Sequence, residues 1–364
     1  MSRVALLAAG GTGGHLFPAT ALAEVLRERG WLAHLVTDRR GARHVDPTDG
    51  LPCTVLPAAG IAGRGLWLRV AALPILGVGA VRAVSLMRRR RPAVVVGFGG
   101  YASVPAGLAA RVRQVPLILH EANAVLGRAN RLLASKAHLL ATTFRSVARI
   151  PAELRPHQVG LPVRAEFEEL ATTDYEPPGP GAAVRLVVTG GSQGARALGI
   201  IVPAALAATD PATRRRIEVL QQARREMVDA VRAAYRDAGI RATVVPFIDD
   251  MAGALRRAHL VVGRAGAATV TENSVAGRPA IYIPLPSSID GHQAANARAA
   301  VAAGAAWVVE EAAGAEATAQ LMARLLVAPG CLAGAAANAR SVVPAGAARR
   351  LADLVEGAAE GGAR

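Results

Sequence analysis

Short apolar runs alternate along the whole chain with segments whose apolar positions recur at helical spacing. One such segment, from Leu16 to Arg29, predicts a helix with a single apolar face made of Ala19, Leu22, Ala23 and Leu26. The apolar runs predict strands at Val4–Ala8, His34–Thr37, Thr54–Leu56, Ala93–Gly97, Pro116–His120, Leu139–Thr142, Arg185–Thr189, Arg216–Leu220, Thr243–Pro246, Leu260–Gly263, Ala280–Ile283 and Ala306–Val309. Such strands, alternating with helices, are typical of parallel sheets covered on both faces, so we expect an α/β protein.

A strand that ends in a glycine-rich turn occurs twice, about 180 residues apart. The first copy is RVALLAAGGTGGH, from Arg3 to His15, and the second is RLVVTGGSQGA, from Arg185 to Ala195. The helix that follows each turn begins with free N–H groups and a partial positive charge, which favours phosphate binding. Neither turn matches the dinucleotide or P-loop pattern, so a tight turn without a ligand stays an alternative. Together the copies suggest two facing domains that hold two phosphate-bearing substrates.

The domain boundary is predicted where glycine and proline interrupt the pattern. GLPVR, from Gly160 to Arg164, is followed by the loop-like segment YEPPGPGAA at 175–183. We expect an N-terminal domain over residues 1–163 and a C-terminal domain over 164–342. A last helix, at about 343–360, is expected to pack back on the first domain.

Composition narrows the classes of partner. The chain of 364 residues carries a net charge of +15, with Lys136 as its single lysine. The arginine excess indicates either a coding bias or attraction to phosphates and anionic membranes. Only 3% of residues are aromatic and no nucleic-acid module is visible, so we expect no nucleic-acid partner. Cys53 and Cys331 lack metal-ligand neighbours, and the start reads as a strand without a signal peptide, which together favour a reducing cytoplasm.

Seven further motifs follow predicted strand ends: GFGGYAS, HEANAVLGRAN, GLPVR, GGSQGA, FIDDM, GRAGAATVTE and PLPSSIDGHQAANA. In this order, and over nearly the whole chain, they resemble the MurG family of N-acetylglucosaminyl transferases. The resemblance implies a GT-B fold, with two Rossmann-like domains whose parallel sheets face an interdomain cleft. It implies inverting transfer of N-acetylglucosamine from UDP-N-acetylglucosamine to the 4-hydroxyl of undecaprenyl-diphospho-N-acetylmuramoyl-pentapeptide. It also implies that no cofactor and no metal is needed.

The same resemblance places the donor on a defined set of residues. Ser192 and Arg164 would donate to the diphosphate, where negative charge builds as UDP leaves. Glu272 would accept from the ribose hydroxyls, and backbone groups of Ile248 would read uracil. Gln293 would pair with sugar hydroxyls. The full set of expected donor-binding residues is Thr12, Gly13, Gly14, Asn123, Arg164, Ser192, Ile248, Ala267, Ala268, Thr269, Glu272, His292 and Gln293.

The acceptor hydroxyl must lose a proton as it attacks, so the reaction needs a general base. His15 is the first candidate, because a helix start favours its neutral form. Glu121 and His120 are rivals that the sequence does not rank. The family resemblance places the acceptor on Gly13, Gly14, His15 and Tyr101. Asp249 and Asp250 fit a helix cap better than a metal site.

An apolar stretch from Val70 to Val81 is too short to span a bilayer. It is bordered by Arg64, Arg69, Arg82 and a run of four arginines at 88–91. This pattern favours a helix that lies on an anionic leaflet, with a buried helix as the alternative. With the family resemblance, it predicts a peripheral protein on the cytoplasmic face of the cell membrane.

Two other functions stay open at this point. One is a GT-B transferase of specialised metabolism that acts on another polyprenyl or a soluble acceptor. The other is a protein that binds a nucleotide sugar without catalysis.

Overall fold

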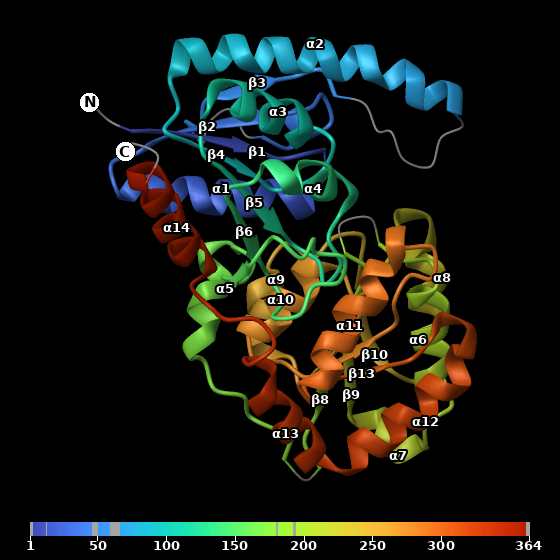
Figure 1. Ribbon diagram of the computed structural model, residues 1–364. Coiled ribbons are helices and arrows are strands. Elements are labelled where there is room, and N and C mark those ends of the chain that lie inside the picture. The colour runs from blue at the N-terminus through green and yellow to red at the C-terminus, as the bar shows by residue number, and fades with distance from the viewer. Residues whose placement is uncertain are drawn as a thin grey trace. The chain divides into compact units, whose positions relative to one another are not determined.

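The computed structural model describes residues 3–11, 13–45, 50–58, 66–179, 181–191 and 194–361. The chain divides into two compact units, shown as a ribbon in Figure 1. The N-terminal unit runs up to Arg164 and takes up the chain again from Gly346, and the C-terminal unit is Ala165–Ala345. The candidate residues Thr12 and Ser192 lie outside the described residues.

The N-terminal unit contains a parallel sheet of seven strands in the order β3-β2-β1-β4-β5-β6-β7. The strands are β1 Val4–Ala8, β2 Leu32–Thr37, β3 Cys53–Val55, β4 Val94–Gly97, β5 Leu117–Glu121, β6 Leu139–Thr142 and β7 Pro156–Gln158. The helices are α1 Gly13–Glu28, α2 Leu66–Arg90, α3 Ser103–Arg113, α4 Arg128–Leu133 and α14 Ala347–Gly361, with short 3-10 turns at Gly41–His44 and Ala134–Lys136.

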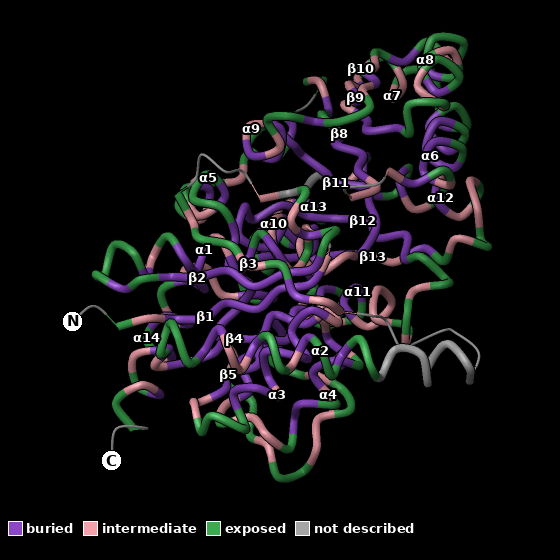
Figure 2. The backbone as a smooth tube through the Cα atoms, turned by 90° about the horizontal axis from the view of Figure 1, so that it is seen from above, coloured by how far each residue is buried: buried purple, intermediate pink, exposed green. Residues whose placement is uncertain are grey.

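Alternate side chains of these strands enter two separate cores. Leu7 and Leu35 lie on the face covered by α1 and α14, and Leu6 and Val36 lie on the face covered by α2 and α3. Successive residues of a strand point to opposite faces, so an uninterrupted apolar run builds both cores at once. Figure 2 shows the strands as the buried centre of the unit.

The last helix is held to the N-terminal unit by charge as well as by packing. Arg29 forms ion pairs of 2.7 and 2.8 Å with Asp353 and Glu356 of α14. The Trp31 indole N–H donates to Glu356 at 3.3 Å. The chain therefore returns from the C-terminal unit to complete the N-terminal one.

The C-terminal unit contains a parallel sheet of six strands in the order β10-β9-β8-β11-β12-β13. The strands are β8 Val184–Thr189, β9 Ile217–Gln222, β10 Arg241–Val245, β11 Leu260–Gly263, β12 Ala280–Tyr282 and β13 Ala306–Val308. The helices are α5 Ala165–Glu168, α6 Leu198–Ala207, α7 Pro211–Arg216, α8 Val228–Asp237, α9 Met251–Arg257, α10 Ala267–Val275, α11 His292–Ala302, α12 Gly314–Val327 and α13 Pro329–Ala339, with 3-10 turns at Glu169–Thr172, Arg225–Met227, Ile289–Gly291 and Glu311–Ala313.

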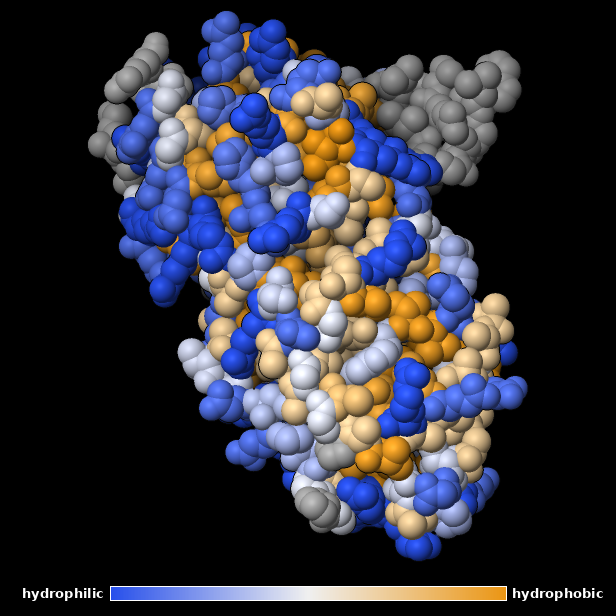
Figure 3. Space-filling model, turned by 60° about the horizontal axis from the view of Figure 1, so that its bottom comes forward, coloured by the Kyte–Doolittle hydropathy of each residue, from blue (hydrophilic) through white to orange (hydrophobic). Residues whose placement is uncertain are grey.

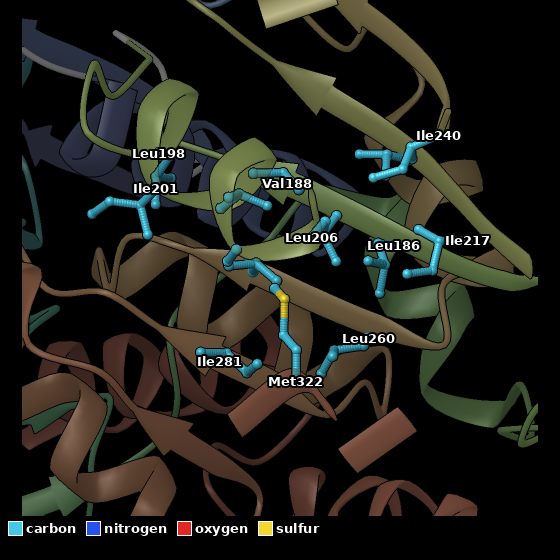
Figure 4. Close-up of a cluster of buried hydrophobic side chains, with 14 of the residues drawn as sticks. Leu186, Val188, Leu198, Ile201, Leu206, Ile217, Ile240, Leu260, Ile281 and Met322 are labelled. Carbon is cyan, nitrogen blue, oxygen red and sulfur yellow. The ribbon is translucent and has the colours of Figure 1, made fainter. Parts of the chain in front are cut away.

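Helices α6, α8 and α12 cover one face of this sheet with a continuous apolar core. Figure 4 shows Leu186 and Val188 of β8 near Leu206 of α6, with Met322 of α12 and Ile281 of β12 in the same cluster. Each of these side chains is at most 1% exposed. Because the sides of the sheet are filled by apolar side chains, we expect polar site residues at the carboxyl ends of the strands, where the loops begin.

Within the described ranges, no single helix has the length and apolar composition to cross a membrane. The segments Glu311–Val327 and Gly330–Ala339, bent by 98°, pass that test only as a pair. Both contribute side chains to the core just described.

All twelve predicted strands are present, with small shifts at their ends. Strand β7 was missed because Pro156–Gln158 is short, polar and mostly exposed. It pairs with β6 at the edge of the sheet, where few side chains need to be apolar.

Candidate active site

Both sheets change winding direction at one point, between β1 and β4 in the N-terminal unit and between β8 and β11 in the C-terminal unit. Helices that leave the two central strands of such a sheet pass to opposite faces, which opens a crevice at the carboxyl ends of the strands. Each of the two glycine-rich turns follows the first strand of its switch point.

At the N-terminal switch point, two backbones meet where no side chain fits. A Cβ built on Gly10 would lie 2.9 Å from the Cα of Gly100, and a Cβ on Gly100 would lie 2.8 Å from the Cα of Gly10. The Gly10 N–H donates to the Gly99 carbonyl at 3.2 Å. Gly99 and Gly100 both have positive φ, a conformation that favours glycine. Glycine at these positions therefore allows the turn after β1 to pack against the turn after β4.

His15 lies in the first turn of α1 and is only partly buried. A Cβ on Gly99 would lie 3.3 Å from its ring carbon Cε1, so the imidazole packs over the glycine turn. Gly13 and Gly14 precede it in the same turn, and Gly14 is exposed. Tyr101 follows the β4 turn and is partly buried. The structure thus places these acceptor candidates around one switch point.

Glu121, the last residue of β5, is 3% exposed and accepts four hydrogen bonds. Its Oε1 accepts from the backbone N–H and the side-chain amide of Asn123, at 3.0 and 3.3 Å. Its Oε2 accepts from the Gly127 N–H and from Asn130 Nδ2, both at 2.8 Å. The carboxylate thereby ties the 122–130 segment to the end of the strand.

His120 points to the other side of β5 and is fully buried. Its Nε2 lies 2.8 Å from the Gly160 carbonyl, and its ring lies 5.5 Å from that of Phe98. Burial lowers the pKa of His120 to about 4, with a smaller contribution in the same direction from His15. The imidazole is thus neutral at physiological pH, and its Nε2 supports the GLPVR segment.

Arg164 ends that segment and is exposed. Its guanidinium carbon lies 5.9 Å from the ring centre of Phe17, two residues after His15 in α1. This contact keeps the end of GLPVR beside the α1 start within the N-terminal unit.

At the C-terminal switch point, the strands also approach through glycine. A Cβ on Gly263 would lie 2.9 Å from the carbonyl oxygen of Thr189, and one on Gly190 would lie 2.2 Å from the Ala195 nitrogen. Gly263 therefore allows β11 to lie against the end of β8, and Gly190 allows the turn after β8 to close on itself.

Helix α10 begins directly after β11 at this point. Gly266 is its N-cap with extended backbone, and Ala267, Ala268 and Thr269 form the first turn. Glu272, one turn further on, is partly buried. The N–H groups of a first turn lack partners within the helix, and such free donors favour phosphate binding.

The remaining donor candidates lie on neighbouring loops. Ile248 is 7% exposed, in the turn between β10 and α9. In the same turn, Asp250 caps α9 by accepting from the Gly253 N–H at 2.7 Å. Gln293, at the start of α11, accepts from the Leu285 N–H at 2.9 Å, and His292 Nδ1 lies 2.7 Å from the Ile289 carbonyl.

Two models of glycosyltransferase family 28 match this chain, the N-terminal domain over residues 5–142 and the C-terminal domain over residues 185–327. A relative from Granulibacter bethesdensis is 49% identical over 97% of this chain and 93% of its own length. Its name is UDP-N-acetylglucosamine--N-acetylmuramyl-(pentapeptide) pyrophosphoryl-undecaprenol N-acetylglucosamine transferase. A relative of the same name from Rhodospirillum rubrum is 47% identical over 97% of this chain and 92% of its own length.

The chain belongs to the MurG family. The crystal structure of Acinetobacter baumannii MurG matches it with a TM-score of 0.79 and 31% identity, over 97% of this chain and 99% of that one. The glycosyltransferase of kitacinnamycin matches at 18% identity with a TM-score of 0.70, which shows the fold alone. The two Rossmann-like units are thus those of a GT-B glycosyltransferase.

Three buried polar residues of this MurG-family chain were missed by the sequence analysis: Asn130, Arg264 and Asn296. Each lies at the carboxyl edge of a sheet and donates hydrogen bonds to backbone or carboxylate oxygens. All three lie inside motifs quoted above, but nothing in their spacing distinguishes a residue that holds a loop from one that contacts a ligand. Among the described residues, no group of three or more His, Cys, Asp or Glu side chains is placed to hold a metal ion.

Proposed function

We propose that this protein transfers N-acetylglucosamine from UDP-N-acetylglucosamine to the 4-hydroxyl of a lipid-linked N-acetylmuramoyl-pentapeptide, with inversion at the anomeric carbon. The observation that carries the proposal is the match to named N-acetylglucosamine transferases over nearly the whole of both chains. The product is the lipid-linked disaccharide precursor of peptidoglycan. The residues at each switch point support this reaction, as follows.

The donor is assigned to the C-terminal unit. The α10 start offers backbone N–H groups to the diphosphate, and Glu272 is placed one turn away to accept from ribose hydroxyls. In our proposal Ser192 and Arg164 add donors to the leaving diphosphate. Backbone groups of Ile248 would bind uracil. The charge of departing UDP is then stabilised by N–H groups and a guanidinium.

His15 is proposed as the general base. Glu121 already accepts four hydrogen bonds, and His120 is fully buried with its Nε2 at the Gly160 carbonyl. His15 is the one of the three with partial exposure, and it borders the turns that we assign to the acceptor. Glu121 and His120 then serve to position the surrounding loops rather than to move the proton.

The proposed membrane contact uses the exposed side of α2. Ile75, Val78 and Val81 recur every three residues and are 42, 50 and 71% exposed, while Leu76 is buried. The helix ends in the exposed arginines at 88–90. The helix therefore has a buried face and an exposed apolar face with a basic end, which suits an anionic inner leaflet. We propose peripheral binding there, on the cytoplasmic side.

The direct test of the activity is a transfer assay with purified protein and a short-chain lipid-linked muramoyl acceptor. Radiolabelled UDP-N-acetylglucosamine, UDP-glucose and UDP-N-acetylgalactosamine are supplied in turn. We expect label in the lipid fraction from the first donor. In a parallel reaction with a soluble acceptor, transfer to that acceptor alone would favour a transferase of specialised metabolism. Donor binding without transfer in either reaction would favour a non-catalytic binder.

The membrane contact is tested by sedimentation with phosphatidylglycerol vesicles. Val81→Asp should release the protein from the vesicles and make the remaining binding more sensitive to salt. Val327→Asp is a matched control, because Val327 is 73% exposed in the C-terminal unit. Equal loss in both variants, or in neither, contradicts the assignment of α2.

A further inference from the structure

Arg264 is a buried arginine at the carboxyl edge of the C-terminal sheet. It follows β11 directly, and its side chain is 8% exposed. Its Nη1 donates to the carbonyls of Ile283 and Pro284, at 2.8 and 3.1 Å. Its Nη2 lies 2.5 Å from a carboxylate oxygen of Glu311. One guanidinium thus joins the ends of three adjacent strands, β11, β12 and β13.

The segment that Arg264 holds leads into the start of α11. Beyond Pro284, the Leu285 N–H donates to Gln293 Oε1 at 2.9 Å, which fixes the Gln293 side chain on this segment. An amide whose oxygen is engaged in this way has its NH₂ group left to offer as a donor. The position of that NH₂ group therefore depends on the position of the 283–293 segment.

A second hydrogen bond links the same two segments, this time with its donor on α11. Asn296, fully buried on α11, donates from Nδ2 to the Ala265 carbonyl at 3.0 Å. Ala265 lies between Arg264 and Gly266, the N-cap of α10. The turn that begins the proposed phosphate-binding helix and the segment that carries Gln293 are thus joined by hydrogen bonds in both directions.

The chemistry of this position requires arginine. Ile283 and Pro284 are both buried and follow the end of β12, so their carbonyls need donors from outside the sheet. A planar guanidinium can serve two carbonyls and one carboxylate at once, whereas a lysine ammonium is a single point of charge. Burying a cation is costly unless it is fully paired, which indicates that a fixed geometry is needed here.

We propose that Arg264 is a positioning residue for the sugar part of the donor. It holds the 283–293 segment beside the α10 start, so that the Gln293 amide meets the sugar while the nucleotide is bound elsewhere on the same edge. This inference rests on the proposed function, because it takes a UDP-sugar as the ligand. Arg264 itself does not contact the reacting atoms.

The test compares the affinities of UDP-N-acetylglucosamine and of UDP alone, measured by titration calorimetry on the full-length protein. In Arg264→Lys we expect the ratio of the two affinities to fall about tenfold, the equivalent of one hydrogen bond, while UDP binds within about twofold of wild type. Asn296→Asp should lower the same ratio, because it sets a carboxylate against the Ala265 carbonyl. The donor KM in the transfer assay should rise in step.

Arg278→Lys is the matched control. Arg278 is also buried, at 2% exposure, and donates to the backbone carbonyl of Asp174. It precedes β12, so it lies at the amino edge of the sheet, away from the proposed donor site. We expect it to change thermal stability but to leave the affinity ratio as in wild type.

An unchanged ratio in Arg264→Lys, an equal loss of both ligands, or the same fall in Arg278→Lys would overturn the inference. Should Arg264→Lys fail to fold, Glu311→Gln reports the same ratio with the guanidinium retained, and an unchanged ratio there counts against the inference equally. Wild-type protein that binds donor but transfers nothing would refute the proposed function while leaving the role of Arg264 measurable. Wild-type protein that does not bind UDP-N-acetylglucosamine would refute both.

Discussion

The four hydrogen bonds to Glu121 allow a sharp test of which group is the base. In Glu121→Gln one carboxylate oxygen becomes an NH₂ group, and that group then faces two donors. If the amide replaces Oε2, these are the Gly127 N–H and Asn130 Nδ2. If it replaces Oε1, they are the two N–H donors of Asn123. Either orientation converts two of the four hydrogen bonds into contacts between donors.

The expected magnitude follows from the number of bonds lost. A hydrogen bond to a charged group contributes about 1.5–3 kcal/mol, so the loss of two destabilises the N-terminal unit by about 3 kcal/mol or more. For a unit of this size, 3 kcal/mol corresponds to a fall in Tm of about 6–12 °C. Glu153→Gln is the control, because Glu153 is exposed in the same unit. We expect its Tm to stay within about 1 °C of wild type.

Kinetics then separate a positioning role from a proton transfer. A general base acts only in its deprotonated form, so the wild-type rate falls in acid. If Glu121 positions the loop, Glu121→Gln lowers kcat/KM but keeps the acid limb of the pH–rate profile. His15→Gln should remove that limb and lower kcat by about 10²–10⁴-fold. A Glu121→Gln variant with wild-type Tm and a flat acid limb would refute the reasoning and make Glu121 the base.

Three further predictions follow from single contacts. Glu272→Ala should raise the donor KM strongly with a smaller effect on kcat, and an unchanged donor KM in the transfer assay would remove Glu272 from the ribose site. Burial, aided by Arg90, lowers the pKa of His34 to about 4, so between pH 6.5 and pH 4 the unfolded chain takes up a proton that the folded one excludes. Stability therefore falls in acid by up to about 3 kcal/mol from this group, and His34→Asn should flatten that part of a plot of Tm against pH. Tyr235→Phe deletes the 2.5 Å hydrogen bond to Gln221 and should cost about 1–3 kcal/mol in urea unfolding, with donor affinity unchanged.

The strands could be predicted from the sequence because their burial is nearly continuous. Val94–Gly97, for example, is a short apolar run in which every residue is buried, and such a run is typical of a central strand in a covered parallel sheet. Strand β7 gave no such signal, because a three-residue edge strand is held by backbone hydrogen bonds to β6 alone. The order of the strands was also hidden, since it depends on which apolar faces meet in space. The close backbone contacts Gly10–Gly100 and Thr189–Gly263 mark the switch points only after the order is known.

The sequence left three candidates for the base because it shows neighbours along the chain and not partners in space. His120 and Glu121 are adjacent, and in a strand they point to opposite faces. The partner of His120 is 40 residues away at Gly160, and those of Glu121 extend to Asn130. Each partner lies beyond a turn whose course the pattern of residues does not determine. Only the interatomic distances reveal that both side chains already have hydrogen-bond partners within the protein.

The two units solve one physical problem with opposite charges. Loops at the carboxyl edge of a parallel sheet must carry ligand groups at fixed positions, yet their backbone groups have no neighbouring strand to pair with. In the N-terminal unit the carboxylate of Glu121 gathers four donors, and in the C-terminal unit the guanidinium of Arg264 gathers two carbonyls and a carboxylate. A single charged group with several lone pairs or N–H bonds fixes more loop atoms than any neutral side chain of its size, because each charge-assisted bond is stronger than a neutral one. In the sequence such residues look like catalytic groups, because they are charged and lie in motifs at strand ends. The number of hydrogen bonds that a buried charged residue makes to nearby loops should therefore be examined before a catalytic role is assigned to it.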